Sequence, residues 1–193
     1  MEEVWIKYAL DKLKNVYGED IKRLFNVEIS DTSIKFPRIT FKEAKEILKE
    51  EYHFIGEKED DFERKEENLL CEYAKKKYNC DFIFITKFPF AARPFYHMLD
   101  DDGLTNSYDL LFKGVEITTG AQREHRVDIL TNQMLEKGIK PESLNFYLDF
   151  FKYGCPPHGG FAIGIARIMM QIFEIDNIRE ATFIYRGPTR LNP

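Results

Sequence analysis

The segment 154–175, with the sequence GCPPHGGFAIGIARIMMQIFEI, constrains the fold more than any other part of the chain. Pro156 and Pro157 cannot continue a preceding helix, so a turn must lie there. The following residues alternate with the period of a strand, and their glycines leave one face nearly bare, where backbone can approach a ligand. From Ile168 the apolar positions change to the period of a helix, with Arg167 on its first turn. This arrangement suits a flat anionic ligand such as a nucleotide, although glycines kept for packing and a solvated Arg167 would give the same pattern.

Length and composition limit the class of protein. With 193 residues we expect a single domain over 1–193 with a core of its own. The 33 acidic and 28 basic residues give a formal net charge of -5, which argues against non-specific adhesion to nucleic acid. No run of about 18 apolar residues and no basic leader occur, so neither a membrane span nor a targeting segment is expected. The odd number of cysteines, without metal-ligand spacing, predicts reduced thiols in a cytoplasmic protein: Cys71, Cys80 and Cys155.

The N-terminal part, 1–79, is expected to be mainly helical. Apolar spacing predicts a helix over 2–17, which Gly18 could stop. Thr40 and Glu43 have the spacing of a capping box, so a second, short helix is expected to follow them. This pair is better explained as a helix cap than as a functional site.

Two further features of this part are less regular. A short strand is expected over 27–29. The almost entirely charged run 57–68 is typical of a solvated helix face rather than of a binding site. Asp60 or Asp61 is expected to cap this helix, whose apolar stripe ends near Tyr78.

The C-terminal part, 80–193, is expected to form the sheet that carries the site. Runs rich in β-branched and aromatic residues predict strands at 81–86, 107–112, 115–119, 161–165 and 180–185. Helices are expected at 124–137, 141–153 and 168–175. The loop 87–106 has a length that is often functional. Because the strand connections are short, we predict an α+β fold with a mainly antiparallel sheet, with helices on one face and a ligand groove on the other.

Two carboxylates near the middle of this sheet could hold a metal ion. Asp109 and Glu116 are seven residues apart, which on one straight strand would put them on opposite faces. A break at Lys113 and Gly114 would let them converge. With the hydroxyl of Thr119 they would supply the oxygen ligands that Mg²⁺ prefers beside phosphate and water. Two separately exposed acids are the alternative interpretation.

Polar side chains crowd into 122–126, directly after the predicted strand. Arg123 could hold a carboxylate through a forked, charge-assisted pair. The alternative, a surface arginine at a helix start, is mildly disfavoured by the helix dipole. His125 and His158 are expected to be hydrogen-bonding or packing residues, and Cys155 is not expected to be a nucleophile.

Two linked motifs carry a resemblance to a known family. YDLLFKGVEITTGAQREHR (108–126) and YGCPPHGGFAIGIARIMMQIFEIDNIREA (153–181) together resemble the C-terminal part of class II aminoacyl-tRNA synthetases of the aspartate, asparagine and lysine subgroup. The likeness is greatest to the archaeal-type aspartyl enzymes. GGFAIGIAR (159–167) looks like their motif 3, and FITKFPFAARPFYHM (84–98) looks like the strand and loop before the substrate pocket. The resemblance covers 80–193 well and the preceding part more loosely.

The resemblance implies an ATP site with Mg²⁺. Arg167 would stack over the adenine and reach the phosphates, and Gly164 would allow close approach. Glu116 and Asp109, with Thr119 in place of the more usual serine, match the metal and ATP ligands of the family. Arg167 and Glu116 would be the catalytic residues, acting by positioning and charge neutralisation.

The resemblance also implies the second substrate and the reaction. Arg123 matches the arginine that holds the side-chain carboxylate of aspartate, and Gly160 would line the same substrate site. The family reaction is attack by the amino-acid carboxylate on the α-phosphate of ATP, followed by transfer to tRNA. Ala166 departs from the family pattern, because an acidic residue usually precedes the motif 3 arginine.

The function expected from this resemblance is that of an aspartyl-tRNA synthetase-like domain that binds ATP, Mg²⁺ and aspartate. The family's motifs 1 and 2 and its anticodon-binding barrel are expected to be missing, so tRNA binding is open, and a homodimer or partner chain could supply the missing motifs. Two alternatives are an asparagine synthetase-like amide ligase that works without tRNA, and a non-catalytic paralogue that binds nucleotide or a partner protein.

Overall fold

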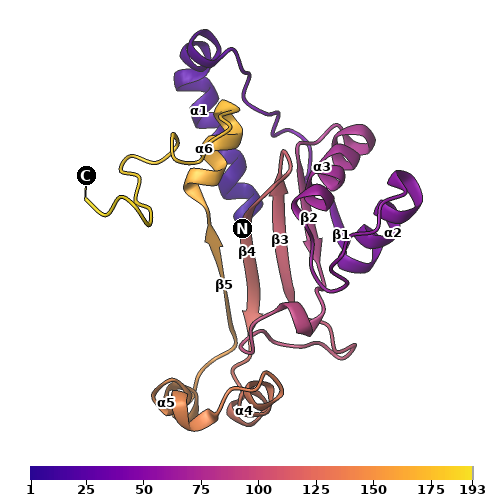
Figure 1. Cartoon of the computed structure of the whole chain (residues 1–193), viewed down its shortest axis with the longest axis vertical. Helices are drawn as coiled ribbons and strands as arrows, with labels where there is room; N and C mark the ends of the chain where they lie inside the picture. The colour runs from indigo at the N-terminus through magenta and orange to yellow at the C-terminus, as the bar shows by residue number, and fades with distance from the viewer. Residues whose placement is uncertain (193) are drawn as a thin grey trace.

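The frame of the structure is a five-stranded sheet in the order β1-β2-β3-β4-β5 (Figure 1). The computed structural model describes residues 1–192. β1 and β2 are parallel, and all other neighbours are antiparallel, which confirms the predicted α+β fold with a mainly antiparallel sheet. The strands are β1 (Arg38–Thr40), β2 (Phe82–Thr86), β3 (Ser107–Phe112), β4 (Val115–Arg123) and β5 (His158–Ile163).

Helices lie on both faces of this sheet and beyond one of its ends (Figure 1). The α-helices are α1 (Glu2–Phe25), α2 (Phe41–Tyr52), α3 (Arg64–Tyr78), α4 (Val127–Glu136), α5 (Asn145–Lys152) and α6 (Ile165–Phe173). Short 3₁₀ turns occur at Phe90–Ala92, in the long loop, and at Pro141–Leu144, directly before α5. No helix within residues 1–192 is long and apolar enough to cross a membrane.

The expectation that helices cover only one face is wrong, because β2 and β3 are apolar on both faces. Phe82 and Phe84 of β2 face the core formed with α1 and α6, whereas Ile83 and Ile85 face the core formed with α2 and α3. In the first core, Phe82 stacks between Phe36 and Phe112 with ring centroids 4.2 Å away on each side. A strand buried on both faces needs cover from both sides.

Three N-terminal predictions differ from the structure. Helix α1 continues through Gly18 to Phe25, because Ile21 extends the buried face that includes Ile6 and Leu10. Asn26, with φ of 57°, ends the helix instead. The expected strand at 27–29 is absent, since that segment has no ladder partner. Strand β1 was not predicted at all.

The predicted caps have mixed outcomes. Thr40 caps α2 through a reciprocal box: its hydroxyl accepts from the Glu43 amide, and the Glu43 carboxylate accepts from the Thr40 amide at 2.7 Å. Helix α3 ends at Tyr78 as predicted. Its first residue is Arg64, however, so the cap position belongs to Glu63 and not to Asp60 or Asp61.

The C-terminal predictions are largely confirmed, with one exception. Strands β2 to β5 and helices α4 to α6 appear close to their expected positions. The segment 180–185 forms turns and bends, and its Phe183 is fully exposed. This predicted strand is absent because no neighbouring strand hydrogen-bonds to it among the described residues. β5 is therefore the edge of the sheet, and most of its side chains are exposed.

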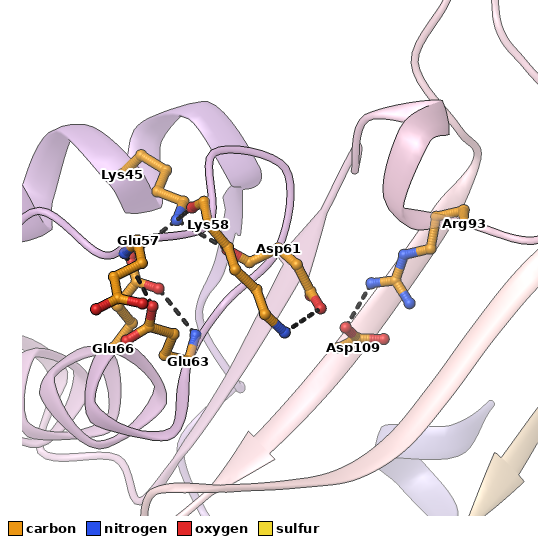
Figure 2. A network of polar contacts seen from close by, with 8 residues as sticks. All are labelled: Lys45, Glu57, Lys58, Asp61, Glu63, Glu66, Arg93 and Asp109. Atoms are coloured by element: carbon orange, nitrogen blue, oxygen red, sulfur yellow. Dashed lines mark hydrogen bonds and ion pairs between the residues drawn. The ribbon is translucent and has the colours of Figure 1, made fainter.

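A buried ion pair fixes the segment 53–63 against α2 and α3 (Figure 2). Glu66 is fully buried, and one of its oxygens accepts from Lys45 Nζ at 2.8 Å. The other oxygen accepts from the Glu63 amide at 2.8 Å. Lys45 also donates to the carbonyl oxygens of Lys58 and Asp61. The first part of the charged run, 57–63, is thus an ordered loop organised by one lysine and not the predicted helix face, since the helix begins only at Arg64.

Removing the buried carboxylate should destabilise the fold. We expect Glu66→Ala to lower the free energy of unfolding by about 2 to 3 kcal/mol, because Lys45 and the Glu63 amide lose their buried partner. Glu72→Ala is the control, since Glu72 forms only an exposed pair with Lys76, and it should cost less than about 0.5 kcal/mol. Urea denaturation measures both, and equal losses would contradict the role given to Glu66.

Candidate functional site

A bulge in β4 determines which side chains share the site. Lys113 and Gly114, with φ of 46° and 86°, form the tight turn of a hairpin between β3 and β4. Leu111 pairs with Glu116, but Leu110 pairs with Thr118, so Ile117 is an extra residue in β4. The turn already places Glu116 on the face of Asp109. The bulge brings Thr119 to that face as well, directly opposite Asp109.

Arg93, from the loop between β2 and β3, connects two of these residues. Its Nη2 forms an ion pair with Asp109 at 2.5 Å (Figure 2). Its Nη1 donates to the Thr119 hydroxyl at 3.3 Å. The guanidinium also lies 3.7 Å from the ring centroid of Phe88. Oδ1 of Asp109 is buried without a hydrogen-bond partner. One oxygen of this carboxylate therefore remains for another ligand.

Glu116 and Arg167 form the second part of the site. Nη1 of Arg167 donates to the backbone oxygen of Glu116 at 2.8 Å and approaches its carboxylate at 3.4 Å. The amide of Gly164, the residue before α6, donates to the Ile117 carbonyl at 2.8 Å. A Cβ at Gly164 would lie 3.3 Å from Cδ of Arg167. Glycine at this position thus gives the arginine side chain room beside the backbone.

A cavity of about 410 Å³ opens between α3, β4 and α6. Its lining residues are Arg64, Glu67, Val115, Glu116, Arg167, Met170, Asp176, Asn177 and Ile178. Burial, and then the neighbouring charges of Glu116 and Asp109, raise the pKa of Glu67 to about 7. Burial, and then the neighbouring Asp109, also raises the pKa of Glu116. Without a bound cation, the charged forms of the Glu67 and Glu116 carboxylates are therefore disfavoured in this cavity.

The two carboxylates and the hydroxyl suit a magnesium ion that also has water and phosphate oxygens as ligands. Within residues 1–192 no group of three His, Cys, Asp or Glu side chains could hold a metal ion. Two carboxylates and one hydroxyl do share a face, and one carboxylate oxygen there is unpartnered. Mg²⁺ is usually held by one or two carboxylates together with phosphate oxygens and water. The set Asp109, Glu116 and Thr119 therefore remains a prediction with suitable chemistry.

Arg123 lies at the far end of β4, on the strand and not at a helix start. Its guanidinium is 4.7 Å from the ring centroid of Tyr96, and its Nη1 is buried without a hydrogen-bond partner. Burial and the charges of Arg123 and Arg93 lower the pKa of His97 to about 4, so His97 is neutral here. The region lacks a negative partner for Arg123.

A second cavity, of about 460 Å³, lies beside Arg123. Phe95, Tyr96, Leu144, Phe146, Tyr147, His158 and Gly159 line it together with the arginine. Gly160 in β5 faces the same guanidinium, since a Cβ there would lie 3.8 Å from Nη2 of Arg123. The structure thus places two predicted substrate residues, Arg123 and Gly160, next to each other.

Cys155 and His158 are close in space but do not form a catalytic pair. Sγ of Cys155 lies 3.5 Å from Nδ1 of His158. The same Nδ1 lies 3.0 Å from the Pro156 carbonyl oxygen, which can only accept a hydrogen bond. Nδ1 is therefore the protonated nitrogen and cannot take a proton from the thiol. This agrees with the expectation that Cys155 is not a nucleophile.

Sequence reasoning missed Arg93, Glu67 and Glu66. The signal for Arg93 was an arginine in an aromatic-rich loop just before the carboxylate-bearing strand. Glu66 continues the helical stripe of Leu70 and Tyr73 at spacings of four and seven, so periodicity could have identified it as buried. Nothing in the charged run itself distinguishes Glu67 from its exposed neighbours.

Comparisons with known proteins identify the family. Residues 1–185 match the family model described as tRNA synthetases class II (D, K and N). The chain therefore belongs to this family of class II synthetases, which confirms the resemblance inferred from its two motifs.

The curated relatives narrow the similarity to aspartate ligases. The Aspartate–tRNA(Asp/Asn) ligase of Thermus thermophilus is 42% identical over 100% of this chain, which covers 45% of that protein. The Aspartate–tRNA(Asp) ligase of Pyrococcus abyssi is 39% identical over 97% of this chain, which covers 43% of that protein. The chain thus spans less than half the length of the curated relatives it matches.

Solved structures show the same fold. The aspartyl tRNA synthetase from Entamoeba histolytica has a TM-score of 0.92 and 39% identity, covering 100% of this chain and 40% of that one. The asparaginyl-tRNA synthetase from Pyrococcus horikoshii complexed with asparaginyl-adenylate has a TM-score of 0.88 and 31% identity. The match covers 100% of this chain and 44% of that one. Both aspartate and asparagine enzymes therefore share this architecture.

The pKa of Glu67 leads to a pH-dependent prediction for the chain without Mg²⁺ or nucleotide. Native Glu67 keeps its proton up to a pH of about 7, whereas the unfolded side chain loses it near 4.5. Between those values the native state binds more protons than the unfolded state, so the free energy of unfolding falls as the pH rises. Glu67→Gln should match wild type near pH 4 and be more stable by about 2 kcal/mol at pH 8.

Urea denaturation across this pH range measures the difference between variant and wild type. Glu72→Gln, on the exposed part of the same helix, controls for exchanging a glutamate for a glutamine. A Glu67→Gln difference that does not grow with pH would show that Glu67 is not held in an unfavourable environment.

Proposed function

We propose that this chain carries the ATP, Mg²⁺ and aspartate part of an aspartate–tRNA ligase active site. The observation that carries the proposal is the buried, unpartnered Nη1 of Arg123, whose guanidinium lies next to Gly160 beside a cavity. A buried guanidinium without a partner is costly, and a carboxylate is its best-matched ligand. The names of the relatives, which are aspartate ligases, support the same amino acid.

Aspartate is favoured over asparagine by charge. The guanidinium of Arg123 forms a charge-assisted pair with a carboxylate, whereas an amide offers this guanidinium only a neutral carbonyl oxygen as acceptor. His97, kept neutral by its surroundings, adds no competing charge. The side-chain carboxylate of aspartate would lie on Arg123, with its reacting carboxylate directed along β4 toward Glu116.

ATP is proposed to occupy the cavity beside Arg167 and Glu116. The half-exposed guanidinium of Arg167 can lie against the adenine while its hydrogen bonds to Glu116 fix its position. Glu116, Thr119 and the free Oδ1 of Asp109 would hold Mg²⁺. Arg93 holds Asp109 and Thr119 in place through its own two bonds. When bound, the metal would neutralise charge that develops on the phosphates.

The reaction proposed for this site is formation of aminoacyl-adenylate. An oxygen of the aspartate α-carboxylate attacks the α-phosphorus of ATP, a new P–O bond forms, and the bond to the bridging oxygen breaks with release of pyrophosphate. The residues of this chain contribute by holding both substrates in line and by offsetting negative charge. We propose that further groups complete the site and take part in the transfer to tRNA. These groups would come from further sequence or from a partner chain, and would correspond to the part of the relatives that this chain does not match.

Binding and exchange measurements test the proposal on the purified chain. Calorimetric titration should show binding of ATP with Mg²⁺ and of aspartate in preference to asparagine. Aspartate-dependent exchange of pyrophosphate into ATP would then demonstrate adenylate formation. Failure of a folded chain to bind either ligand would overturn the proposal. Formation of asparagine from aspartate, ATP and ammonia without tRNA would instead favour the amide ligase.

The two arginines should separate the two substrates. Arg123→Ala should weaken aspartate binding by roughly a hundredfold, because a desolvated charged pair contributes about 1.5 to 3 kcal/mol, and should leave ATP nearly unchanged. Arg167→Ala should weaken ATP binding by roughly tenfold, since the side chain is half-exposed, and should leave aspartate nearly unchanged.

Calorimetric titration with each ligand measures both effects. Arg23→Ala, which removes an exposed arginine paired with Asp20, is the control and should change neither affinity. If both site variants weaken ATP equally, the division of the site into an amino-acid end and a nucleotide end is wrong.

A further inference from the structure

We propose that Arg64, at the start of α3, binds the terminal phosphate groups of ATP. This inference rests on the proposed function, and it adds a residue from a part of the chain that the sequence motifs do not include. Arg64 lines the 410 Å³ cavity together with Glu116 and Arg167. It also lines an adjoining cavity of about 360 Å³, with Lys113 and Glu174 among its other residues. Arg64 therefore lies where the two hollows meet.

Arg64 is the cation of this cavity that has no fixed partner. Arg167 is hydrogen-bonded to Glu116 at the wall formed by β4. The side chain of Arg64 makes no hydrogen bond and no ion pair with any residue of 1–192. Its attraction to Glu67, which lowers the pKa of that carboxyl, acts without direct contact. Its donors are thus available to a ligand.

The position of Arg64 is unfavourable for the helix itself. A cation in the first turn is opposed by the helix dipole, whereas Glu66 and Glu67 in the same turn are favoured by it. Arg64 and Glu67 are three residues apart and so lie on one face of α3, the face that lines the cavity. The attraction of Arg64 to Glu67 offsets part of this unfavourable position, and the exposed guanidinium can also stabilise an anion in the cavity.

The anion that fits is a polyphosphate and not the amino acid. Arg123, which is proposed to bind aspartate, lies seven residues along β4 from Glu116, a separation of about 20 Å. Arg64 lies at the Glu116 end, where Glu116 and Glu67 already repel additional carboxylates. Mg²⁺ held by Asp109, Glu116 and Thr119 would offset only part of the charge of a triphosphate, and Arg64 can supply a counter-charge for its far end.

Helix α3 holds this arginine on a rigid base. Glu66, two residues later, is fully buried and paired with Lys45, which also holds the preceding loop through two carbonyl oxygens. The start of α3 is therefore fixed relative to α2. An arginine at this point loses little backbone freedom when a ligand binds.

Titration with ATP, ADP and AMP in the presence of Mg²⁺ tests the assignment. Arg64→Ala should weaken ATP roughly tenfold, ADP by less, and AMP not at all, because only the longer ligands reach it. Arg64→Lys should recover part of the loss, since it retains the charge without the forked geometry. Arg167→Ala should instead weaken all three nucleotides.

The neighbouring residue provides the matched control. Lys65 lies over the ring of Phe54, 4.4 Å from its centroid, and Lys65→Ala should bind all three nucleotides as wild type does. An Arg64→Ala variant that folds and binds ATP as tightly as wild type overturns this inference alone, and so does an equal loss for ATP and AMP. If the wild-type chain binds no nucleotide, the proposed function fails together with it.

Discussion

The site depends on one extra residue in β4. Without Ile117 as a bulge, Thr119 would lie on the opposite face of the sheet from Asp109 and Glu116. The same bulge presents the Ile117 carbonyl to the amide of Gly164 and the Glu116 carbonyl to Arg167. A single irregularity in register therefore brings Thr119 to the face of the two acids and accompanies the docking of α6.

Charge is arranged along β4 in two different ways. Near the start of the strand Arg167 bonds Glu116, and Arg93 pairs with Asp109 of the neighbouring strand β3. At the end of the strand Arg123 has only the π face of Tyr96. The paired acids and arginines near Glu116 suit a cation with phosphate ligands, whereas the guanidinium of Arg123 suits a carboxylate. Opposite ends of one strand thus prefer ligands of opposite character.

The sequence predicted the parts of this fold that depend on local chemistry. The Thr40 and Glu43 cap, the turn at Lys113 and Gly114, and the strands β2 to β4 follow from side-chain pattern and turn residues. Predictions failed where distant contacts decide. Gly18 stays helical because Ile21 is buried further on, and 180–185 needs a strand neighbour that it does not have.

The site residues divide in the same way. Asp109, Glu116, Thr119, Arg123 and Arg167 stand in compact motifs, so a resemblance could locate them. Arg93 and Glu67 reach the site from a loop and a helix that precede those motifs. Their place became visible only through the pairing of Arg93 with Asp109 and through the cavity that Glu67 lines. Whether Thr119 shares the face of the two acids depends on a bulge that no spacing rule at the turn predicts.

The small cluster of α4 and α5 gives the two ends of the site different local stability. Leu130, Met134 and Leu148 form a core separate from the two cores of the sheet, and α5 supplies one wall of the cavity beside Arg123. This unit can open without unfolding the sheet, because few buried contacts hold it. Its backbone amides should therefore exchange with solvent faster than those of β3 and β4. The cavity beside Arg123 can then widen and close while the cavity beside Arg167 keeps its shape.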